Sequence, residues 1–457
     1  MIHLIILILS LSTIMILAYR GYSTIITAPI VALTTLSLTF GLDSHLMANY
    51  TITYMDGFSG FVKNYFPLFL TGAIFAKLME ETDYASSIAH FITKWIHPQR
   101  AILAVVLSGA LLTYGGVSLF VVAFVLYPIA TLLFKEADIP KRLIPGTIAL
   151  GAFTFTMTAL PGSPEIQNVI PMTYFKTDTF AAPIIGIIAS LLMFTIGMIY
   201  LNFRANIARK HQEGYGFTEE MKQEITSKTP PIWLAISPIL IIFTLNLFFS
   251  KLYYPNVDGT YLESFNTTLD SMSGTWSVII SIVIAILFIL LLNIKKLKNI
   301  HSILDIGVKN SFIPLLNSSA IVGYGSVIKT LPIFLGIQTA ILNISPNPII
   351  TEALSVNIIC GLTASASGGL GITLNALAPT FLQMSEPLGI SPEILHRIAS
   401  LSSGGLDTLP HNGAVITTLA IFGLTHKQAY KDMFVTSVII PIFITFLVVV
   451  TTSLLFI

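Results

Sequence analysis

The chain has 457 residues, of which 54% are hydrophobic and only 10% are charged. Soluble domains carry about 25% charged residues, so this composition excludes a soluble protein and predicts an all-α polytopic membrane protein. The net charge is +1 and no stretch is strongly basic, which argues against a nucleic-acid partner. The single cysteine, Cys360, excludes an internal disulfide.

The first half contains apolar segments of the length that a membrane span needs, about 20 residues. One apolar stretch is interrupted by Gly115 and Gly116, which predicts a re-entrant hairpin, and another is broken by two prolines at mid-length. A shorter amphipathic stretch predicts a helix that lies in the membrane interface. In chain order we predict spans at residues 2–19 and 22–42, a polar loop at 43–57, a span at 61–79, the interfacial helix at 84–96, the hairpin at 100–134, the broken span at 140–175 and a span at 181–203.

The second half repeats this order after a charged, soluble linker at residues 204–230. Asp305 and Lys309 lie four residues apart on one predicted helix, so we expect them to form a structural ion pair. The predicted elements are spans at 232–249, 276–292 and 303–328, an interfacial helix at 331–342, a hairpin at 348–384, a broken span at 393–424 and a last span at 433–456.

The shared order indicates an internal repeat, in which residues 1–203 form the first unit and 231–457 the second. Leu-Pro-Gly-Ser-Pro at 160–164 and Leu-Pro-His-Asn-Gly at 409–413 are counterparts, and a Gly-Gly pair precedes each. Each half has five crossings, so the second half is predicted to be inverted, with about 10 full spans plus two hairpins in total. With both termini outside the cell, nearly every cytoplasmic turn carries Lys or Arg, as the positive-inside rule requires.

The two hairpin tips and the two breaks predict a substrate site near mid-membrane. Helix N-termini there offer unpaired N–H groups and partial positive charge, and glycines let the backbone approach a ligand. Such a site suits a small carboxylate. The alternative is that Gly and Ser only allow close helix packing. The predicted substrate-binding residues are Thr113, Tyr114, Gly115, Gly116, Ser118, Thr158, Pro161, Gly162, Ser163, Ser365, Ser367, Gly368, Gly369, Thr408, Pro410, His411, Asn412 and Gly413.

Glu165 and Asp407 are the acids of the two breaks, and charged groups inside a membrane usually mark a pathway or a paired structural site. Neither break contains Lys or Arg, so these carboxyls can carry a proton, with Asp407 as the main carrier. His411 is expected to relay protons or bind substrate, although a lone histidine is as often only hydrogen-bonded. Sodium coordination by Asp407, Asn412 and loop carbonyls is the alternative form of coupling.

Three motifs carry a family resemblance: Thr113-Tyr-Gly-Gly-Val-Ser-Leu-Phe-Val-Val, Ala159-Leu-Pro-Gly-Ser-Pro-Glu-Ile-Gln-Asn and Leu406-Asp-Thr-Leu-Pro-His-Asn-Gly-Ala-Val. They resemble the gluconate permease family, and more narrowly its D-beta-hydroxybutyrate permease-like branch; Gly423-Leu-Thr-His-Lys-Gln-Ala-Tyr-Lys-Asp fits as well. The resemblance implies a bacterial plasma-membrane proton symporter for hydroxycarboxylates such as gluconate or 3-hydroxybutyrate. It also implies the ion-transporter superfamily of inverted-repeat, elevator-type carriers, which are often homodimers. The first break has fewer Pro and His than the sugar-acid members, which favours a smaller acid.

Other classes of membrane protein fit the sequence less well. An integral-membrane enzyme is disfavoured because no His-Glu-x-x-His, paired-aspartate or Gly-x-Ser-x-Gly motif occurs. A channel is disfavoured because two opposed hairpins would block a continuous pore. No ATP-binding loop is present. We therefore expect a secondary carrier in the lipid bilayer, with no enzymatic activity, no cofactor and no metal centre apart from a coupling ion.

Overall fold

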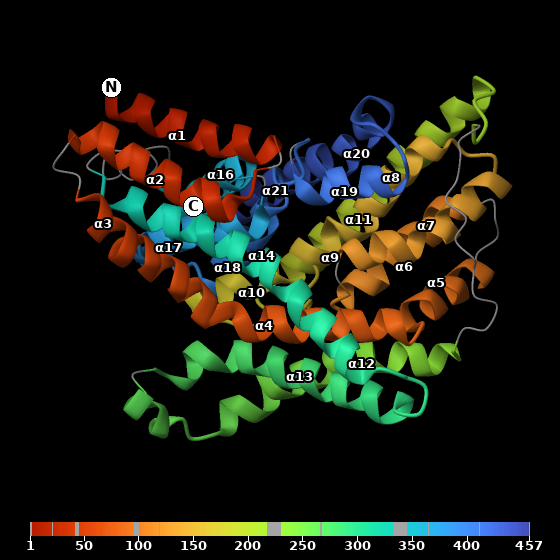
Figure 1. Ribbon diagram of the computed structural model, residues 1–457, viewed down its shortest axis with the longest axis horizontal. Coiled ribbons are helices and arrows are strands. Elements are labelled where there is room, and N and C mark those ends of the chain that lie inside the picture. The colour runs from red at the N-terminus through yellow and green to blue at the C-terminus, as the bar shows by residue number, and fades with distance from the viewer. Residues whose placement is uncertain are drawn as a thin grey trace.

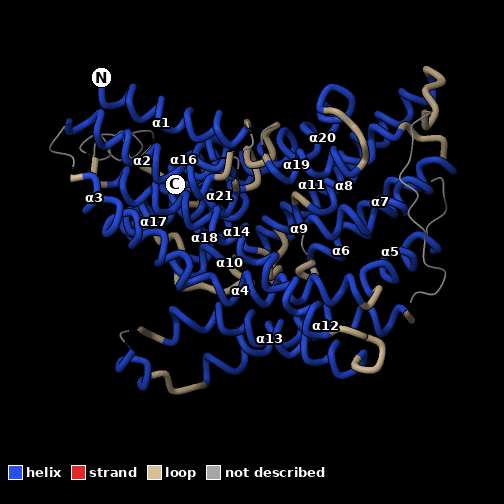
Figure 2. The backbone as a smooth tube through the Cα atoms, viewed as in Figure 1, coloured by secondary structure: helices blue, strands red, loops and turns tan. Residues whose placement is uncertain are grey.

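The computed structural model describes residues 2–20, 22–41, 45–95, 100–117, 119–216, 230–265, 267–331, 345–363, 365–410 and 412–456. Every regular element in these ranges is helical, as Figure 2 shows. The all-α prediction is therefore confirmed for the described part of the chain. The predicted interfacial helix at 331–342 lies almost wholly outside these ranges, and so do the binding-site candidates Ser118 and His411.

The first part of the chain forms helices that run from the N-terminus to the linker. They are α1 (Ile2–Tyr19), α2 (Thr24–Phe40), α3 (Leu46–Ala48), a π-helical segment (Asn49–Tyr54), α4 (Met55–Glu81), α5 (Tyr84–Trp95), α6 (Ala101–Tyr114), α7 (Leu119–Glu136), a 3-10 turn (Lys141–Leu143), α8 (Ile144–Ala152), α9 (Phe155–Thr158), α10 (Ile166–Phe175) and α11 (Pro183–Lys210).

The second part begins after the linker and ends near the C-terminus. It contains α12 (Ile232–Phe248), a π-helical segment (Phe249–Tyr253), 3-10 turns (Tyr254–Asn256 and Thr260–Phe265), α13 (Leu269–Asn293), α14 (Ile300–Lys329), α16 (Pro348–Thr363), α17 (Ala366–Ser385), a 3-10 turn (Glu386–Leu388), α18 (Pro392–Ser403), α19 (Gly413–Ile421), a π-helical segment (His426–Tyr430), α20 (Lys431–Phe434), a π-helical segment (Val435–Ile439) and α21 (Ile440–Leu454).

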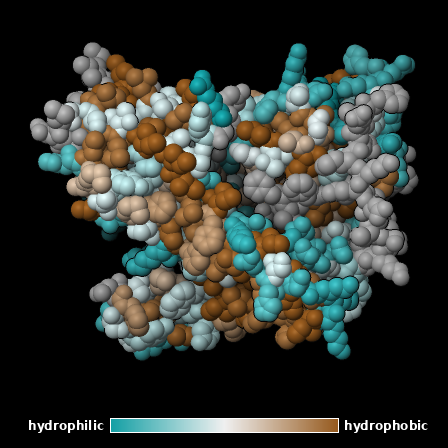
Figure 3. All heavy atoms as spheres, viewed as in Figure 1, coloured by the Kyte–Doolittle hydropathy of each residue, from teal (hydrophilic) through white to brown (hydrophobic). Residues whose placement is uncertain are grey.

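Five helical stretches of the described chain are long and apolar enough to cross a membrane: Pro183–Lys210, Ile232–Asn256, Leu269–Asn293, Ile300–Lys329 and His426–Leu454. Large apolar side chains are exposed on them; Ile184 on α11 and Leu291 on α13 are 72% and 73% exposed. Figure 3 shows hydrophobic residues spread widely over the face in view. A lipid environment explains this exposure, because water would penalise so much apolar surface.

The predicted polar loop at 43–57 is wrong from Leu46 onward, where the chain is already helical. Tyr54 supplies the physical reason, because its side chain is only 3% exposed and its hydroxyl donates to the carbonyl of Ala320, 3.1 Å away. The rings of Tyr50, Tyr54 and Phe58 also follow one another along the helix. Tertiary packing of these rings outweighs the weak helix propensity of the segment.

Two long helices, α4 and α14, pack against each other through the middle of the molecule (Figure 1). The neighbouring contacts come in matching pairs, since α2 packs on α14 while α13 packs on α4. In the same way α10 packs on α17 and α19 packs on α7. Segments from the two halves of the sequence are therefore interleaved in the core.

Two smaller predictions are also borne out. Lys309 Nζ lies 2.6 Å from Asp305 Oδ2, as expected for an ion pair four residues apart. Both side chains are largely exposed, so the pair contributes little to stability. Cys360 is a buried free thiol.

Candidate substrate site

The first break separates α9 from α10 at residues 159–165. Pro161 and Pro164 interrupt the helical hydrogen bonding, and Gly162 adopts φ +81°, which favours glycine. The amide of Gly162 donates to the carbonyl of Thr179 at 2.8 Å, so the loop after α10 supports the break. Ser163 is fully buried beside it.

The first hairpin tip, between α6 and α7, lies against this break. The Tyr114 hydroxyl donates to the Pro161 carbonyl at 2.8 Å. Gly116 has φ +81°, and a Cβ placed there would lie 3.2 Å from Pro164 Cγ. Thr113 is buried, and its hydroxyl has no hydrogen-bond partner. The structure thus brings the tip at 113–117 and the first break together.

The second break separates α18 from α19 at residues 404–412, and its polar groups mainly hold its own backbone. The Thr408 hydroxyl donates to the Ser437 carbonyl at 2.9 Å. The Asn412 side-chain oxygen accepts from the amides of Ala414 and Val415 and so caps α19. Because these amides are already bonded, the N-terminus of α19 is less available to a ligand than the sequence predicts.

The second hairpin is formed by α16 and α17, and its tip contacts α14. The Ser365 side chain accepts from the Gly368 amide at 3.1 Å, and the Ser367 and Ser318 hydroxyls are 2.9 Å apart. A Cβ on Gly369 would lie 2.5 Å from Cys360 Cα, so the glycine allows the two arms to pack closely.

The arm α16 and the helix α18 connect the second half to both breaks. A Cβ on Gly361 would lie 2.8 Å from Leu406 Cβ, which places α16 against the second break. The Ser400 hydroxyl of α18 donates to the Thr158 carbonyl at 2.8 Å, and Gly404 packs against the Thr158 side chain. The two breaks are therefore neighbours across α18.

A buried network around Arg397 also belongs to this region, and sequence reasoning missed it. Arg397 is 0% exposed on α18, and all five of its N–H donors have acceptors. They donate to the carbonyls of Ala159, Thr179 and Ala181 and to Asn168 Oδ1, at 2.8–3.2 Å. The guanidinium therefore ties the second half of the chain to the first break.

His396 and Asn168 complete this network. His396 is fully buried and lies 2.6 Å from the Thr177 hydroxyl and 3.2 Å from Asn168 Oδ1. The Asn168 amide donates to the carbonyls of Ser163 and Thr179 at 2.9 Å. One signal in the sequence could have found the network, since Arg397 and His396 lie inside a predicted span, where ionisable groups have a function or a partner.

Three buried or half-buried acids lie in the two breaks and in the arm α16. Asp407 is 9% exposed, and its Oδ1 has no hydrogen-bond partner. Glu165 is half-buried at the N-cap of α10, where its side chain makes no capping bond. Glu352 on α16 is 0% exposed with neither carboxyl oxygen bonded, and sequence reasoning missed it although an acid within an apolar run is a signal.

Interrupted helices that meet inside an apolar helical protein are typical of membrane transporters. Residues 2–455 match the family described as GntP family permease. The chain is also 43% identical over 455 residues to a Bacillus subtilis protein described as an uncharacterized transporter, YxjC, with 96% of each chain covered. The chain therefore belongs to the GntP permease family.

Solved transporter structures share the fold. The YdaH transporter of Alcanivorax borkumensis superposes with a TM-score of 0.60 at 13% identity, covering 94% of this chain and 98% of its own. MtrF of Neisseria gonorrhoeae gives a TM-score of 0.57 at 12% identity, covering 93% and 94%. The protein is accordingly an integral membrane protein and a secondary transporter, which acts on a small-molecule substrate.

Proposed function

We propose that this transporter moves a small hydroxycarboxylate, such as 3-hydroxybutyrate or gluconate, across the bacterial plasma membrane together with a proton. The observation that carries the proposal is the buried guanidinium of Arg397 beside the first break.

Arg397 supplies positive charge that no direct ion pair neutralises in the described part of the chain, although Asp178 and Glu393 act on it from a greater distance. All of its acceptors are neutral carbonyl and amide oxygens, and none of the ion pairs in the described part of the chain includes it. A full charge in a low-dielectric interior acts strongly on nearby charges. The adjacent N-terminus of α10 lacks a side-chain cap and adds partial positive charge. Both features favour an anion at the first break.

The predicted binding residues divide between the two breaks. In the first break and its tip, Tyr114, Gly116 and Gly162 pack around one backbone turn next to the buried guanidinium, so we propose that the carboxylate lies on this side. In the second break, Thr408 and Asn412 are engaged in holding the backbone. We propose that the second break forms part of the wall of the substrate site and provides the carboxyl of Asp407 that carries the coupled proton.

The membrane potential gives a physical reason why uptake of an anion is coupled to a cation. An anion that enters a cell with a negative interior works against about 2.3 kcal/mol per charge per 100 mV. A co-transported cation removes this opposition. The unbonded Oδ1 of Asp407 is available to bind a proton, and Glu165 is proposed to share this role or to support the first break. Sodium is the alternative cation.

We propose an inverted repeat with both termini outside the cell. Contacts among polar residues support this topology, because groups predicted on one side meet each other. Lys251 Nζ lies 2.8 Å from Asp178 Oδ2 on the predicted outer side. On the predicted cytoplasmic side, Asn293 donates to the Tyr84 hydroxyl at 2.7 Å. The elevator movement and the homodimer stay predictions of the family resemblance.

The experiment is uptake of labelled hydroxy acids by proteoliposomes with an imposed pH or sodium gradient. We expect uptake of at least one small hydroxycarboxylate that rises with an inward proton gradient. Asp407→Asn mimics the protonated acid, so this variant should retain counterflow exchange but lose accumulation driven by the pH gradient. Uptake that follows sodium and ignores pH would contradict proton coupling, and accumulation by Asp407→Asn would exclude this residue as the carrier.

A further inference from the structure

The 423–432 segment, which follows α19, is one of the motifs that carry the family resemblance, and neither break contains it. Gly423 turns the chain after α19 with φ +62°. A capping box then starts the helix, because the Thr425 side chain accepts from the Gln428 backbone amide and Gln428 Oε1 accepts from the Thr425 amide at 2.8 Å. The segment therefore enters its π-helical turn and α20 in a defined orientation.

One end of the segment contacts the carbonyls of the second break. Tyr430 donates its hydroxyl to the Thr408 carbonyl at 3.0 Å. His426 Nε2 lies 2.9 Å from the Pro410 carbonyl. These two carbonyls flank Leu409, in the middle of the break. The two rings stand 5.7 Å apart, so they approach the break together.

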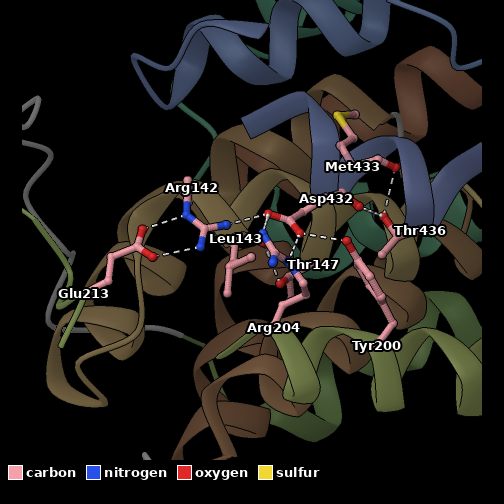
Figure 4. Close-up of polar contacts among 9 residues, drawn as sticks. All are labelled: Arg142, Leu143, Thr147, Tyr200, Arg204, Glu213, Asp432, Met433 and Thr436. Carbon is pink, nitrogen blue, oxygen red and sulfur yellow. Dashed lines mark hydrogen bonds and ion pairs between the residues drawn. The ribbon is translucent and has the colours of Figure 1, made fainter. Parts of the chain in front are cut away.

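The other end of the segment is anchored by Asp432, as Figure 4 shows. Its side chain is 2% exposed, and its Oδ1 accepts from Arg204 Nε at 2.6 Å and from the Tyr200 hydroxyl at 2.8 Å. Its Oδ2 accepts from an Arg142 terminal nitrogen at 2.6 Å. Arg142 in turn makes two bonds to Glu213, at 2.7 and 2.9 Å. Two arginines are thus matched by two acids.

The backbone around Asp432 fits closely against α8. A Cβ on Gly146 would lie 3.1 Å from the Asp432 carbonyl carbon, so only glycine permits this approach without a shift. The Thr436 hydroxyl donates to the Gly146 carbonyl at 3.0 Å. The anchor therefore fixes α20 to α8 and α11, which belong to the first half of the chain.

We propose that the 423–432 segment is a strut that positions the second break for substrate binding. Asp432 fixes one end to the first half, and His426 and Tyr430 hold the carbonyls of Thr408 and Pro410 at the other. Both carboxyl oxygens of Asp432 are occupied by hydrogen bonds from two arginines and a tyrosine, so we assign it an anchoring role and leave the coupled proton to Asp407. The inference rests on the proposed transport function and adds positioning residues to it.

The test compares Tyr430→Phe and Asp432→Asn with two matched controls. Tyr430→Phe removes one hydroxyl and keeps the ring, so it should fold even where Asp432→Asn does not. Tyr261→Phe and Asp305→Asn make the same changes at exposed positions. In proteoliposomes, with the hydroxy acid that the wild type transports, we expect KM to rise about three- to tenfold for each strut variant, the effect of one lost hydrogen bond. The pH dependence of uptake should not change.

Two further readouts separate a strut from a merely structural role. The double variant should have a KM close to that of the worse single variant, because both changes release the same contact. In a Cys360→Ala background, Leu409→Cys should react with a thiol reagent faster in Tyr430→Phe than with Tyr430 intact. This labelling needs no substrate, so it tests the strut even if the proposed substrate is wrong. Unchanged KM and labelling in folded Tyr430→Phe, or additive effects on KM, would overturn the proposal.

Discussion

Replacement of Arg397 by lysine should destabilise the protein although the positive charge is kept. Lysine has three donors and no planar fork, so at least two of the five hydrogen bonds made by Arg397 are lost. Hydrogen bonds to charged groups contribute about 1.5–3 kcal/mol each, so the expected loss is about 3–6 kcal/mol. The site is 0% exposed, so water does not replace the missing donors.

The assay is thermal unfolding of the purified protein in detergent, followed by uptake in proteoliposomes. A loss of this size corresponds to a fall of about 3–6 °C in Tm for a chain of this length. Arg209→Lys is the matched control, because Arg209 is exposed near the end of α11. Arg397→Met additionally removes the charge, so we expect it to lose carboxylate uptake, whereas Arg397→Lys should keep part of it.

Two results would refute this reasoning. An Arg397→Lys protein with the wild-type Tm would mean that the five bonds contribute no stability. A folded Arg397→Met protein with the wild-type KM would mean that the buried charge does not attract the substrate, and the proposed carboxylate site would lose its main support.

Three other predictions follow from the contacts of single residues. Gly369→Val should abolish transport in a protein that still inserts into the membrane, because a Cβ there would lie 2.5 Å from Cys360 Cα; normal uptake would contradict this. Cysteines at Gly214 and Gly259 should label from opposite sides of the membrane, and labelling from one side would refute the inverted repeat. The pKa of Glu213 is lowered chiefly by its hydrogen bond from Arg142, so Glu213→Gln should lower Tm at neutral pH. The difference in Tm between this variant and the wild type should disappear as the pH falls through the pKa of Glu213 in the folded state. A difference that does not depend on pH would contradict this.

Controls for these variants are available in the chain. A Cβ on Gly72 would meet no atom within 4 Å, so Gly72→Ala should transport substrate normally in the assay used for the hairpin variant. Lys309→Gln removes an exposed ion pair and should leave Tm nearly unchanged at every pH.

The positions of the helices could be predicted from the sequence because they depend on local pattern. The arms α6 and α7 occupy the segment predicted at 100–134, and α16 and α17 occupy 348–384. Apolar length defines each helix, and Gly or Pro ends it, so no long-range information is needed. The failure at 43–57 has the opposite cause, since the carbonyl that holds Tyr54 lies 266 residues further along the chain.

The candidate site could be predicted only in part for the same reason. The breaks at 159–165 and 404–412 follow from Pro and Gly, but the partners of Arg397 lie 216–238 residues away in the sequence. The predicted site was limited to the hairpin tips and the breaks, so it did not include Glu352, although an acid in an apolar helix is visible in the sequence. Long-range hydrogen bonding therefore decides which polar residues of a span matter.

The two breaks differ in whether a side chain caps the helix that follows them. In the second break, Asn412 caps α19, and Thr408 is held from both its hydroxyl and its carbonyl. In the first break, α10 has no side-chain cap, and the buried guanidinium of Arg397 donates to the backbone carbonyl of Ala159. A ligand gains most where protein groups are not already bonded to one another, because it does not have to displace them. This difference supports the proposal that the two breaks have different roles. The first break binds the carboxylate, and the second break, which its own hydrogen bonds hold in place, provides the proton-binding carboxyl of Asp407.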